Sequence, residues 1–319
     1  KYSFDAYIFG VTATPYDAYK YAIGEAIKHP LGFDMKLKEP LDFYAVTDHG
    51  FYMGMIENYA DTSSEMSKNE WTKPMHNLNR PENVTVESLG ARADLFSSVL
   101  TQAIIKPYPY WHPKVWKAWL TNNIQVALQS FDYDVHKSAW ADVANAAEEF
   151  NDPGKFTTFI GYEFTTSTDV EGGNLHRNVI FNSSDAPIRP WTRIDSINPE
   201  DLWTWMDGLR DQGVDSLAMP HNSNGSNGQM FEVETFRGSA ISKEYSEKRM
   251  RNEPVVEITQ IKGTSDTHPL LSPDDEWADF EIMDKRVGSR PPTYSMPQGG
   301  YVRDAFLRGL TLEWKGQGN

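Results

Sequence analysis

The sequence contains no cysteine among its 319 residues. A chain without cysteine forms no disulfide, offers no thiolate to a metal and has no cysteine nucleophile. Any metal that the protein binds must therefore be held by histidine, aspartate or glutamate, a ligand set that suits Mn, Fe, Zn or Mg. Because a chain without cysteine survives in reducing and oxidising compartments alike, the cellular location stays open.

Positive charge is also scarce. The chain has 30 lysines and arginines against 45 acidic residues, which gives a formal net charge of -15. A protein of this charge repels nucleic acid backbones and anionic membranes, so neither is expected as a partner. An anionic small molecule can still bind where metal ions reverse the local charge. We therefore expect a small-molecule substrate, anionic in character.

Long apolar runs and linkers are missing as well. No run approaches the roughly 18 apolar residues that a membrane span needs, and no signal peptide is visible at Lys1, where the chain begins without an initiator methionine. Hydrophobic residues still make up 39% of the chain, enough for a sizeable core. Because no Gly/Ser-rich or charged linker divides the chain, we expect a single α/β domain over residues 1–319.

One stretch, residues 41–50, organises the chain. An apolar run rich in strand-forming residues ends in Asp48 and His49, and Gly50 then lets the backbone turn. This pattern is typical of a buried parallel strand that carries polar side chains at its carboxyl end, where α/β enzymes hold their catalytic groups. Neighbouring side chains on a strand point to opposite faces, so one of the two can face a site while the other supports it.

Three more strands carry isolated polar residues of the same kind. They are predicted over residues 157–164, 175–181 and 216–222, and they contribute Glu163, His176 and His221. A lone glutamate in an apolar strand is costly to bury unless it is paired or bound to a metal. Together with His49, these residues predict a mononuclear or multinuclear metal site. The alternative is a set of core histidines satisfied by ordinary hydrogen bonds.

Most of the remaining predicted elements are helices. Helices are predicted from an N-cap at Thr14 to about His29, over residues 86–105, 113–120, 138–150 and 301–312, and from Pro199 onward. Residues 255–262 alternate like a further strand. We interpret residues 51–135 as an insertion or lid. The glycine-rich loop 223–228 is either an anion cradle built from backbone N–H groups or an ordinary surface loop.

The chain resembles the polymerase and histidinol phosphatase superfamily, and more closely its branch known as the domain-of-unknown-function 3604 family. The matching segments are residues 2–7, 41–50, 161–164, 174–181, 220–222, 259–263 and 267–269, which span nearly the whole length. The resemblance implies a distorted β/α barrel, similar to a TIM barrel, that carries the long insertion. It also implies a metal site that hydrolyses phosphoesters through a metal-activated water.

By position, the resemblance assigns metal ligation to Asp5, His49, Glu163, His176 and His221. Asp5 stands where many relatives have a further histidine. The expected cofactors are two or three divalent ions of Mn, Zn or Fe. Asp48 would orient a ligand or relay a proton. The branch often carries an export signal, so the resemblance mildly favours a periplasmic or extracellular location.

The sequence departs from the family pattern at both ends. A His-x-His pair is expected before Lys1 and an Asp-x-His pair after Asn319, and neither is present, so the resemblance implies a chain cut at both ends. Asp266 and His268 have the Asp-x-His form. In this branch a similar segment precedes the closing motif, so we predict that His268 contacts substrate at the edge of the site.

We expect a metal-dependent hydrolase of the phosphoesterase type. Arg177 or Lys262 would hold a nonbridging oxygen or the leaving group. One alternative keeps the metals and changes the substrate to an amide, an ester or a sulfate, because a Lewis-acidic site activates water against several electrophiles.

A second alternative is a noncatalytic domain that binds carbohydrate or protein. It would stack its ligand on tryptophans, of which Trp71, Trp111, Trp116 and Trp140 lie in or near the insertion. The competing interpretation is that these tryptophans simply fill the core of a lid.

Overall fold

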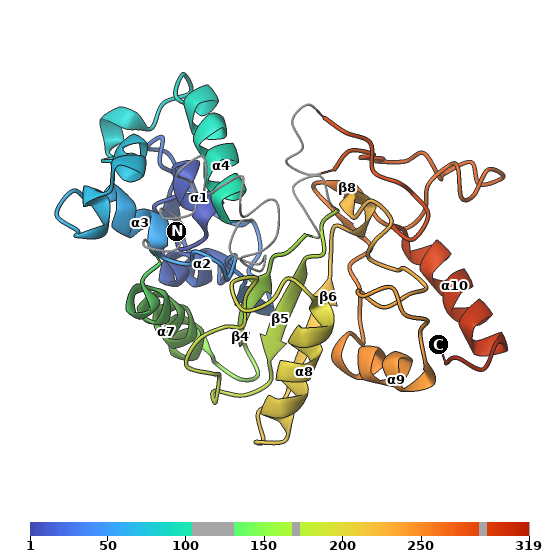
Figure 1. Ribbon diagram of the computed structural model, residues 1–319. Helices are drawn as coiled ribbons and strands as arrows, with labels where there is room; N and C mark the ends of the chain where they lie inside the picture. Colours follow the sequence, from blue (N-terminus) through green and yellow to red (C-terminus); the bar gives the residue numbers. More distant parts are fainter. Residues whose placement is uncertain (104–130, 168–172, 287–291, 319) are drawn as a thin grey trace. The chain divides into compact units, whose positions relative to one another are not determined.

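The computed structural model describes residues 1–103, 131–167, 173–286 and 292–318 (Figure 1). The longer strands form one sheet in the order β3-β4-β5-β6, with β3 at Phe43–Val46, β4 at Thr157–Phe164, β5 at Arg177–Phe181 and β6 at Ser216–Pro220. Strand β3 runs parallel to β4, with Phe43 opposite Thr157 and Val46 opposite Ile160. The prediction of strands in these four segments is therefore confirmed.

The predicted TIM-like barrel is wrong. Besides the four-stranded sheet, the described residues form only two small sheets, which pair β1 (Ile27–Lys28) with β2 (Asp34–Met35) and β7 (Thr259–Gln260) with β8 (Gly263–Thr264). A barrel needs every strand to have a neighbour on both sides, and none of these sheets closes.

Residues 255–262 show why the expected strand does not form. The chain reverses at Ile261 and Lys262, so β7 pairs with β8 as a hairpin of two residues on each side. The side chain of Ile261 is fully exposed. The alternating pattern therefore ends in a turn, and it supplies no strand to the larger sheet.

The chain divides into two compact units. The first comprises Lys1–Tyr162 and Ile180–Ile194, and the second comprises Glu163–Val179 and Asp195–Asn319. Among the described residues, the helices of the first unit are α1 (Phe4–Ile8), α2 (Pro15–Ala22), α3 (Met55–Ala60), the 3-10 helices η1 (Met66–Lys68), η2 (Glu70–Met75) and η3 (Pro81–Asn83), α4 (Leu89–Ala103) and α7 (Tyr133–Phe150). Those of the second unit are α8 (Pro199–Arg210), η4 (Ser223–Gly225), α9 (Lys243–Asn252) and α10 (Val302–Trp314).

The described part of the segment predicted as an insertion is helical. Helices α3 and α4 both contact α1 (Figure 1). Buried side chains from these elements form one hydrophobic cluster that includes Phe4, Ile8, Phe51, Met55 and Tyr59. Residues 51–103 therefore share a core with the N-terminal helix.

Two helices of the first unit differ from their predicted bounds. Helix α2 begins with the predicted Thr14 cap, whose side chain accepts a hydrogen bond from the Asp17 N–H, but it ends at Ala22 because Gly24 has a φ of 85°. Helix α7 begins before Ser138, since Asp132 caps it by accepting from the N–H groups of Asp134 and Val135. The helix predicted over residues 113–120 lies outside the described residues.

A buried ion cluster stabilises the second unit. The Glu253 carboxylate accepts hydrogen bonds from Arg177 Nε at 2.7 Å, Trp203 Nε1 at 2.8 Å and Arg249 Nε at 3.2 Å. The Glu253 side chain is 3% exposed and that of Arg177 2%. Burial alone would raise the pKa of Glu253, but the two arginines hold it below its ordinary value. The cluster ties β5, α8 and α9 together.

The first prediction concerns the contact between α3 and α7. Gly54, the N-cap of α3, has a φ of 75°, and a Cβ there would lie 2.6 Å from the Ala139 Cβ. We expect Gly54→Ala to lower the free energy of unfolding by about 1–3 kcal/mol, measured by urea denaturation. Gly90→Ala is the control, because a Cβ at Gly90 meets nothing within 4 Å. Equal urea midpoints for wild type and Gly54→Ala would contradict this packing.

The second prediction concerns the buried carboxylate. Glu253→Gln leaves the buried Arg177 and the partly exposed Arg249 without a counter-charge, and we expect a loss of about 3–5 kcal/mol in the free energy of unfolding. The matched control is Asp152→Asn, which removes a surface carboxylate paired with Lys155 and should cost about 1 kcal/mol or less.

The pH dependence of the stabilisation by Glu253 follows from the direction in which its pKa is shifted. Because the folded pKa of Glu253 is lowered, its stabilising effect is complete above the unfolded value of about 4.3 and is lost as the pH falls through the folded pKa. The difference between wild type and Glu253→Gln should therefore narrow below about pH 4. A difference that grows as the pH falls would refute the assignment.

Candidate metal centre

Three predicted ligands come together in the second unit. Glu163 lies near the end of β4, His176 directly precedes β5 and His221 directly follows β6. One potential ligand atom from each lies within 4.8 Å of the other two. The His176 Nδ1 is 2.9 Å from Glu163 Oε1, and the His221 Nε2 is 3.4 Å from the same oxygen. Strands distant in sequence therefore bring a carboxylate and two imidazoles to one point.

Local structure explains why Glu163 faces this cluster. Tyr162 and Phe164 on either side of it are completely buried in the core. Because successive side chains of a strand alternate between its faces, Glu163 points to the opposite face from both aromatic rings. The hydroxyl of Thr165 donates to Glu163 Oε1 at 2.9 Å, which fixes the carboxylate further.

A backbone hydrogen bond also joins the two histidine residues. The His221 N–H donates to the His176 carbonyl at 3.2 Å, and the ring centroids are 5.8 Å apart. The side chains are largely buried, with exposed fractions of 12% for Glu163, 16% for His176 and 8% for His221. A carboxylate and two imidazoles in a sheltered position fit the ligand chemistry of Zn, Mn or Fe.

The remaining predicted ligands lie in the first unit and contact each other. The His49 Nε2 is 3.3 Å from Asp5 Oδ2, and the Ser3 hydroxyl donates to Asp5 Oδ1 at 2.7 Å. Burial acts to raise the pKa of Asp5, yet His49 and the hydrogen bonds lower it to about 2. Asp5 is therefore ionised over the physiological range.

Asp48 accepts a hydrogen bond from Ser3, which also contacts Asp5 and His49. Its Oδ1 accepts from the Ser3 N–H at 2.9 Å, while the Ser3 hydroxyl accepts from the His49 N–H at 3.2 Å. Burial raises the pKa of Asp48. Ser3 thus links Asp5, Asp48 and His49. Sequence reasoning missed Ser3, and the only signal for it was a small hydroxyl residue inside the matching segment 2–7.

The side chains predicted to hold substrate have different surroundings. The Arg177 guanidinium is buried against Glu253 and also donates to the Leu175 carbonyl at 2.7 Å. Lys262 lies in the β7–β8 hairpin, and its Nζ donates to Asn222 Oδ1 at 3.4 Å, one residue from His221. The Lys262 ammonium therefore contacts the residue that follows His221, while the Arg177 guanidinium is engaged in the ion cluster.

His268 is not in the cluster of ligand atoms found among the described residues. Its ring packs against Tyr301 at 5.5 Å between centroids, and its Nδ1 accepts from the Leu270 N–H. Burial lowers the pKa of His268. The neighbouring Asp266 pairs with Arg303 at 2.6 Å.

The loop after His221 uses its backbone internally. The N–H groups of Asn224 and Asn227 donate to the hydroxyls of Ser265 and Ser295. Those of Gly225 and Ser226 donate to carbonyls within the loop. These four N–H groups are thus not available for the anion cradle that the composition of residues 223–228 suggested.

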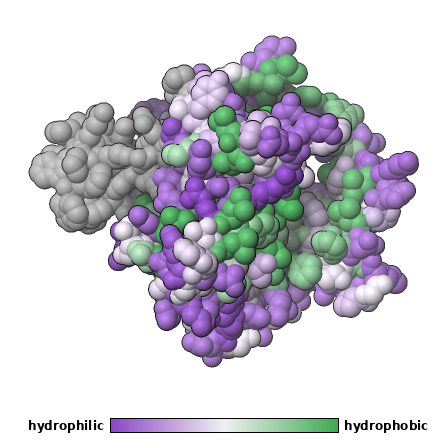
Figure 2. All heavy atoms as spheres, turned by 90° about the vertical axis from the view of Figure 1, so that its right-hand side faces the viewer, coloured by the Kyte–Doolittle hydropathy of each residue, from purple (hydrophilic) through white to green (hydrophobic). Residues whose placement is uncertain are grey.

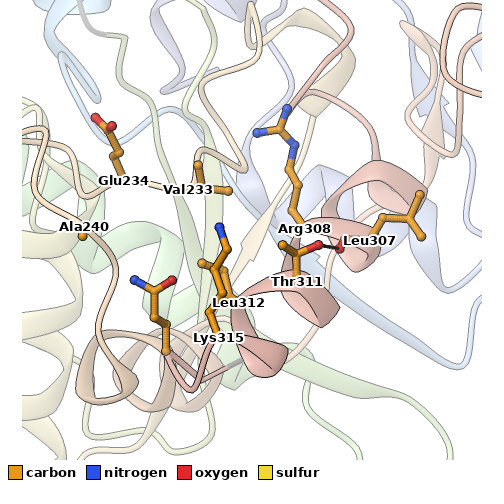
Figure 3. Close-up of a pocket in the computed structure, with 9 residues that line it drawn as sticks. Val233, Glu234, Ala240, Leu307, Arg308, Thr311, Leu312 and Lys315 are labelled. Carbon is orange, nitrogen blue, oxygen red and sulfur yellow. Dashed lines mark hydrogen bonds between the residues drawn. The ribbon is translucent and has the colours of Figure 1, made fainter.

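A cavity of about 400 Å³ lies elsewhere in the second unit, beside α10 (Figure 3). Its walls combine apolar side chains with Glu234, Arg308 and Lys315, and none of the predicted site residues lines it. The same helix exposes Phe306, Leu307, Leu310 and Trp314. Figure 2 looks at the side of the molecule that is on the right in Figure 1, and it shows apolar side chains exposed among hydrophilic ones.

Among the described residues, no helix combines the length and apolar character needed to cross a membrane.

Comparison with curated proteins and with solved structures gave no match. A family model described as "Protein of unknown function (DUF3604)" matches residues 1–319. The matching segments predicted from the sequence include the strand ends that carry Glu163, His176 and His221. The chain therefore belongs to the DUF3604 family.

Proposed function

We propose that the protein is a metal-dependent hydrolase of the phosphoesterase type. The observation that carries this proposal is the convergence of Glu163, His176 and His221, with ligand atoms within 4.8 Å of one another. The motif segments that contain these residues also support a relationship with the polymerase and histidinol phosphatase superfamily. We extend the family assignment to that superfamily as part of the proposal.

The residues of the second unit have distinct roles in this proposal. Glu163, His176 and His221 would hold a divalent ion, while Thr165 keeps the Glu163 carboxylate oriented through its hydroxyl. A bound metal supplies Lewis acidity, which lowers the pKa of water and polarises a substrate oxygen. Lys262 adds a positive charge next to the loop that follows His221, which favours an anionic substrate.

Asp5 and His49 are proposed as further metal ligands in the first unit, with Asp48 supporting them through Ser3. With the centre of the second unit, they would give a total of two or three ions of Mn, Zn or Fe. The ionised state of Asp5 is the state that a metal ligand requires.

The noncatalytic alternative has less support. The Trp140 ring is 2% exposed and its Nε1 donates to the Pro187 carbonyl at 2.6 Å, so it belongs to the core. Trp71 packs edge-on against Tyr59 at 4.8 Å. Trp111 and Trp116 lie outside the described residues. A stacking surface for sugars is therefore not formed by Trp140.

Metal content tests the proposal. Protein purified without chelator and equilibrated with Mn or Zn should contain one or more metal equivalents, measured by inductively coupled plasma mass spectrometry. His176→Ala combined with His221→Ala removes both imidazoles and should lower the affinity of this centre for metal by at least tenfold, since even outer-shell changes cost that much. His29→Ala is the control, because His29 stacks on Phe33 and is not part of the ligand cluster. A wild-type protein that takes up neither metal would refute the proposal.

The reaction class requires a separate assay. The metal-loaded protein is incubated with phosphomonoesters, phosphodiesters, sulfate esters, carboxylic esters and amides. We expect hydrolysis of phosphoesters that is lost with the two histidines and retained in His29→Ala. Selective hydrolysis of an amide, a carboxylic ester or a sulfate would instead identify the alternative hydrolase.

A further inference from the structure

Two buried side chains that directly follow His221 have hydrogen-bond donors without a partner. Asn222 and Ser223 have no exposed surface. Within the described residues, neither the Asn222 Nδ2 nor the Ser223 Oγ has a hydrogen-bond partner. A buried polar group left unpaired costs about 1–3 kcal/mol, so two in succession require a bound water or a ligand as partner.

The orientation of the Asn222 amide is fixed by charge. Its Oδ1 accepts from the Lys262 ammonium. If the amide were flipped, its NH₂ group would face a cation that has only donors, so the carbonyl oxygen must point to Lys262. The Asn222 Nδ2 therefore points away from Lys262, as a donor whose direction is set.

Lys262 is itself held at this loop. The Asn224 side chain donates to the Lys262 carbonyl at 3.0 Å and to the Met283 carbonyl at 3.2 Å. The Ser265 hydroxyl donates to Asn224 Oδ1 at 3.1 Å. Asn224 has no exposed surface, so a fully buried amide connects the loop after His221 to the backbone of the β7–β8 hairpin, from which the Lys262 side chain reaches Asn222.

A third unpaired donor belongs to Asn174, two residues before His176 in the sequence. Asn174 is 6% exposed, and its Nδ2 likewise has no partner among the described residues. Its backbone N–H donates to the Gly225 carbonyl at 3.1 Å, so the segment before His176 is joined to the loop after His221. Three unpaired neutral donors thus belong to residues within two positions of His176 or His221 along the chain, and the Lys262 ammonium contacts one of these residues, Asn222.

We infer that Asn174, Asn222, Ser223 and Lys262 form an oxyanion-binding subsite next to the Glu163, His176 and His221 centre. Its ligand is a tetrahedral oxyanion of the phosphate or sulfate type, whose several oxygens can accept from all of these donors. The subsite binds the anionic group of the substrate through three neutral donors and one positive charge. The inference rests on the proposed function for its role in catalysis, but the subsite can be tested without catalysis.

Asn222→Gly is the most informative variant. Asn222 has a φ of 54°, a conformation in which glycine is unstrained, so the substitution removes the amide and preserves the backbone. Asn77→Gly is the matched control, because Asn77 has a φ of 56° and lies in the first unit. Both variants carry the same chemical change in the same conformation. Ser223→Ala tests the hydroxyl independently. It keeps the subsite testable if Asn222→Gly does not fold.

The experiment measures binding of inorganic phosphate by isothermal titration calorimetry, with and without Mn, and repeats it with inorganic sulfate. We expect Asn222→Gly and Ser223→Ala to raise the phosphate Kd by about tenfold to a hundredfold, since each removes a hydrogen bond to a charged group. Asn77→Gly should leave the Kd unchanged. A stronger effect on sulfate than on phosphate would assign the subsite to sulfate-type ligands.

The outcomes separate this inference from the proposed function. Metal content is measured on the same samples. If metal content is normal and both variants bind phosphate and sulfate as wild type does, the subsite is refuted and the proposed metal centre stands. If wild type takes up no metal but phosphate binding weakens in the variants, the subsite stands and the metalloenzyme proposal fails. A wild type that binds neither anion in either metal state also refutes the subsite.

Discussion

The second unit depends on how it accommodates a carboxylate within an apolar strand. Glu163 lies between two completely buried aromatic residues of β4, and its own side chain is 12% exposed. A carboxylate in such a place is costly unless other groups compensate it. The compensation comes from His176, His221 and the Thr165 hydroxyl. The residues that compensate the carboxylate of Glu163 are thus the same residues that form the candidate metal centre with it.

Sequence patterns predicted the strands and the ligand cluster because both depend on local signals. A short apolar run that carries or adjoins a single polar residue identifies a strand with a candidate ligand, as for Glu163 within β4, His176 before β5 and His221 after β6. The same reasoning failed for the barrel, because closure depends on how many strands pair in one sheet. Residues 255–262 have the alternation of a strand, yet Lys262 and Ile261 form a turn, and no local signal distinguished the two outcomes.

Roles that arise from distant contacts could not be predicted from the sequence. Arg177 was expected to hold substrate, but its partner is Glu253, 76 residues away. Lys262 was expected to do the same, and its contact with Asn222 spans 40 residues. Ser3 gains its importance only when β3 brings Asp48 and His49 beside α1. Each of these residues has an ordinary local pattern, and its function depends on the partner that the fold supplies.

Glu163 and Glu253, two sheltered glutamates of the second unit, differ in the charges around them. Glu253 faces two arginines, whose charge is permanent, so its negative charge is more than balanced by protein groups. Glu163 faces two histidines, which are not permanently charged, and its own position is almost as sheltered. A divalent cation would balance the carboxylate and use the lone pairs of both neutral imidazoles. The surplus positive charge of that cation would in turn attract an anion toward the unpaired donors of Asn174, Asn222 and Ser223.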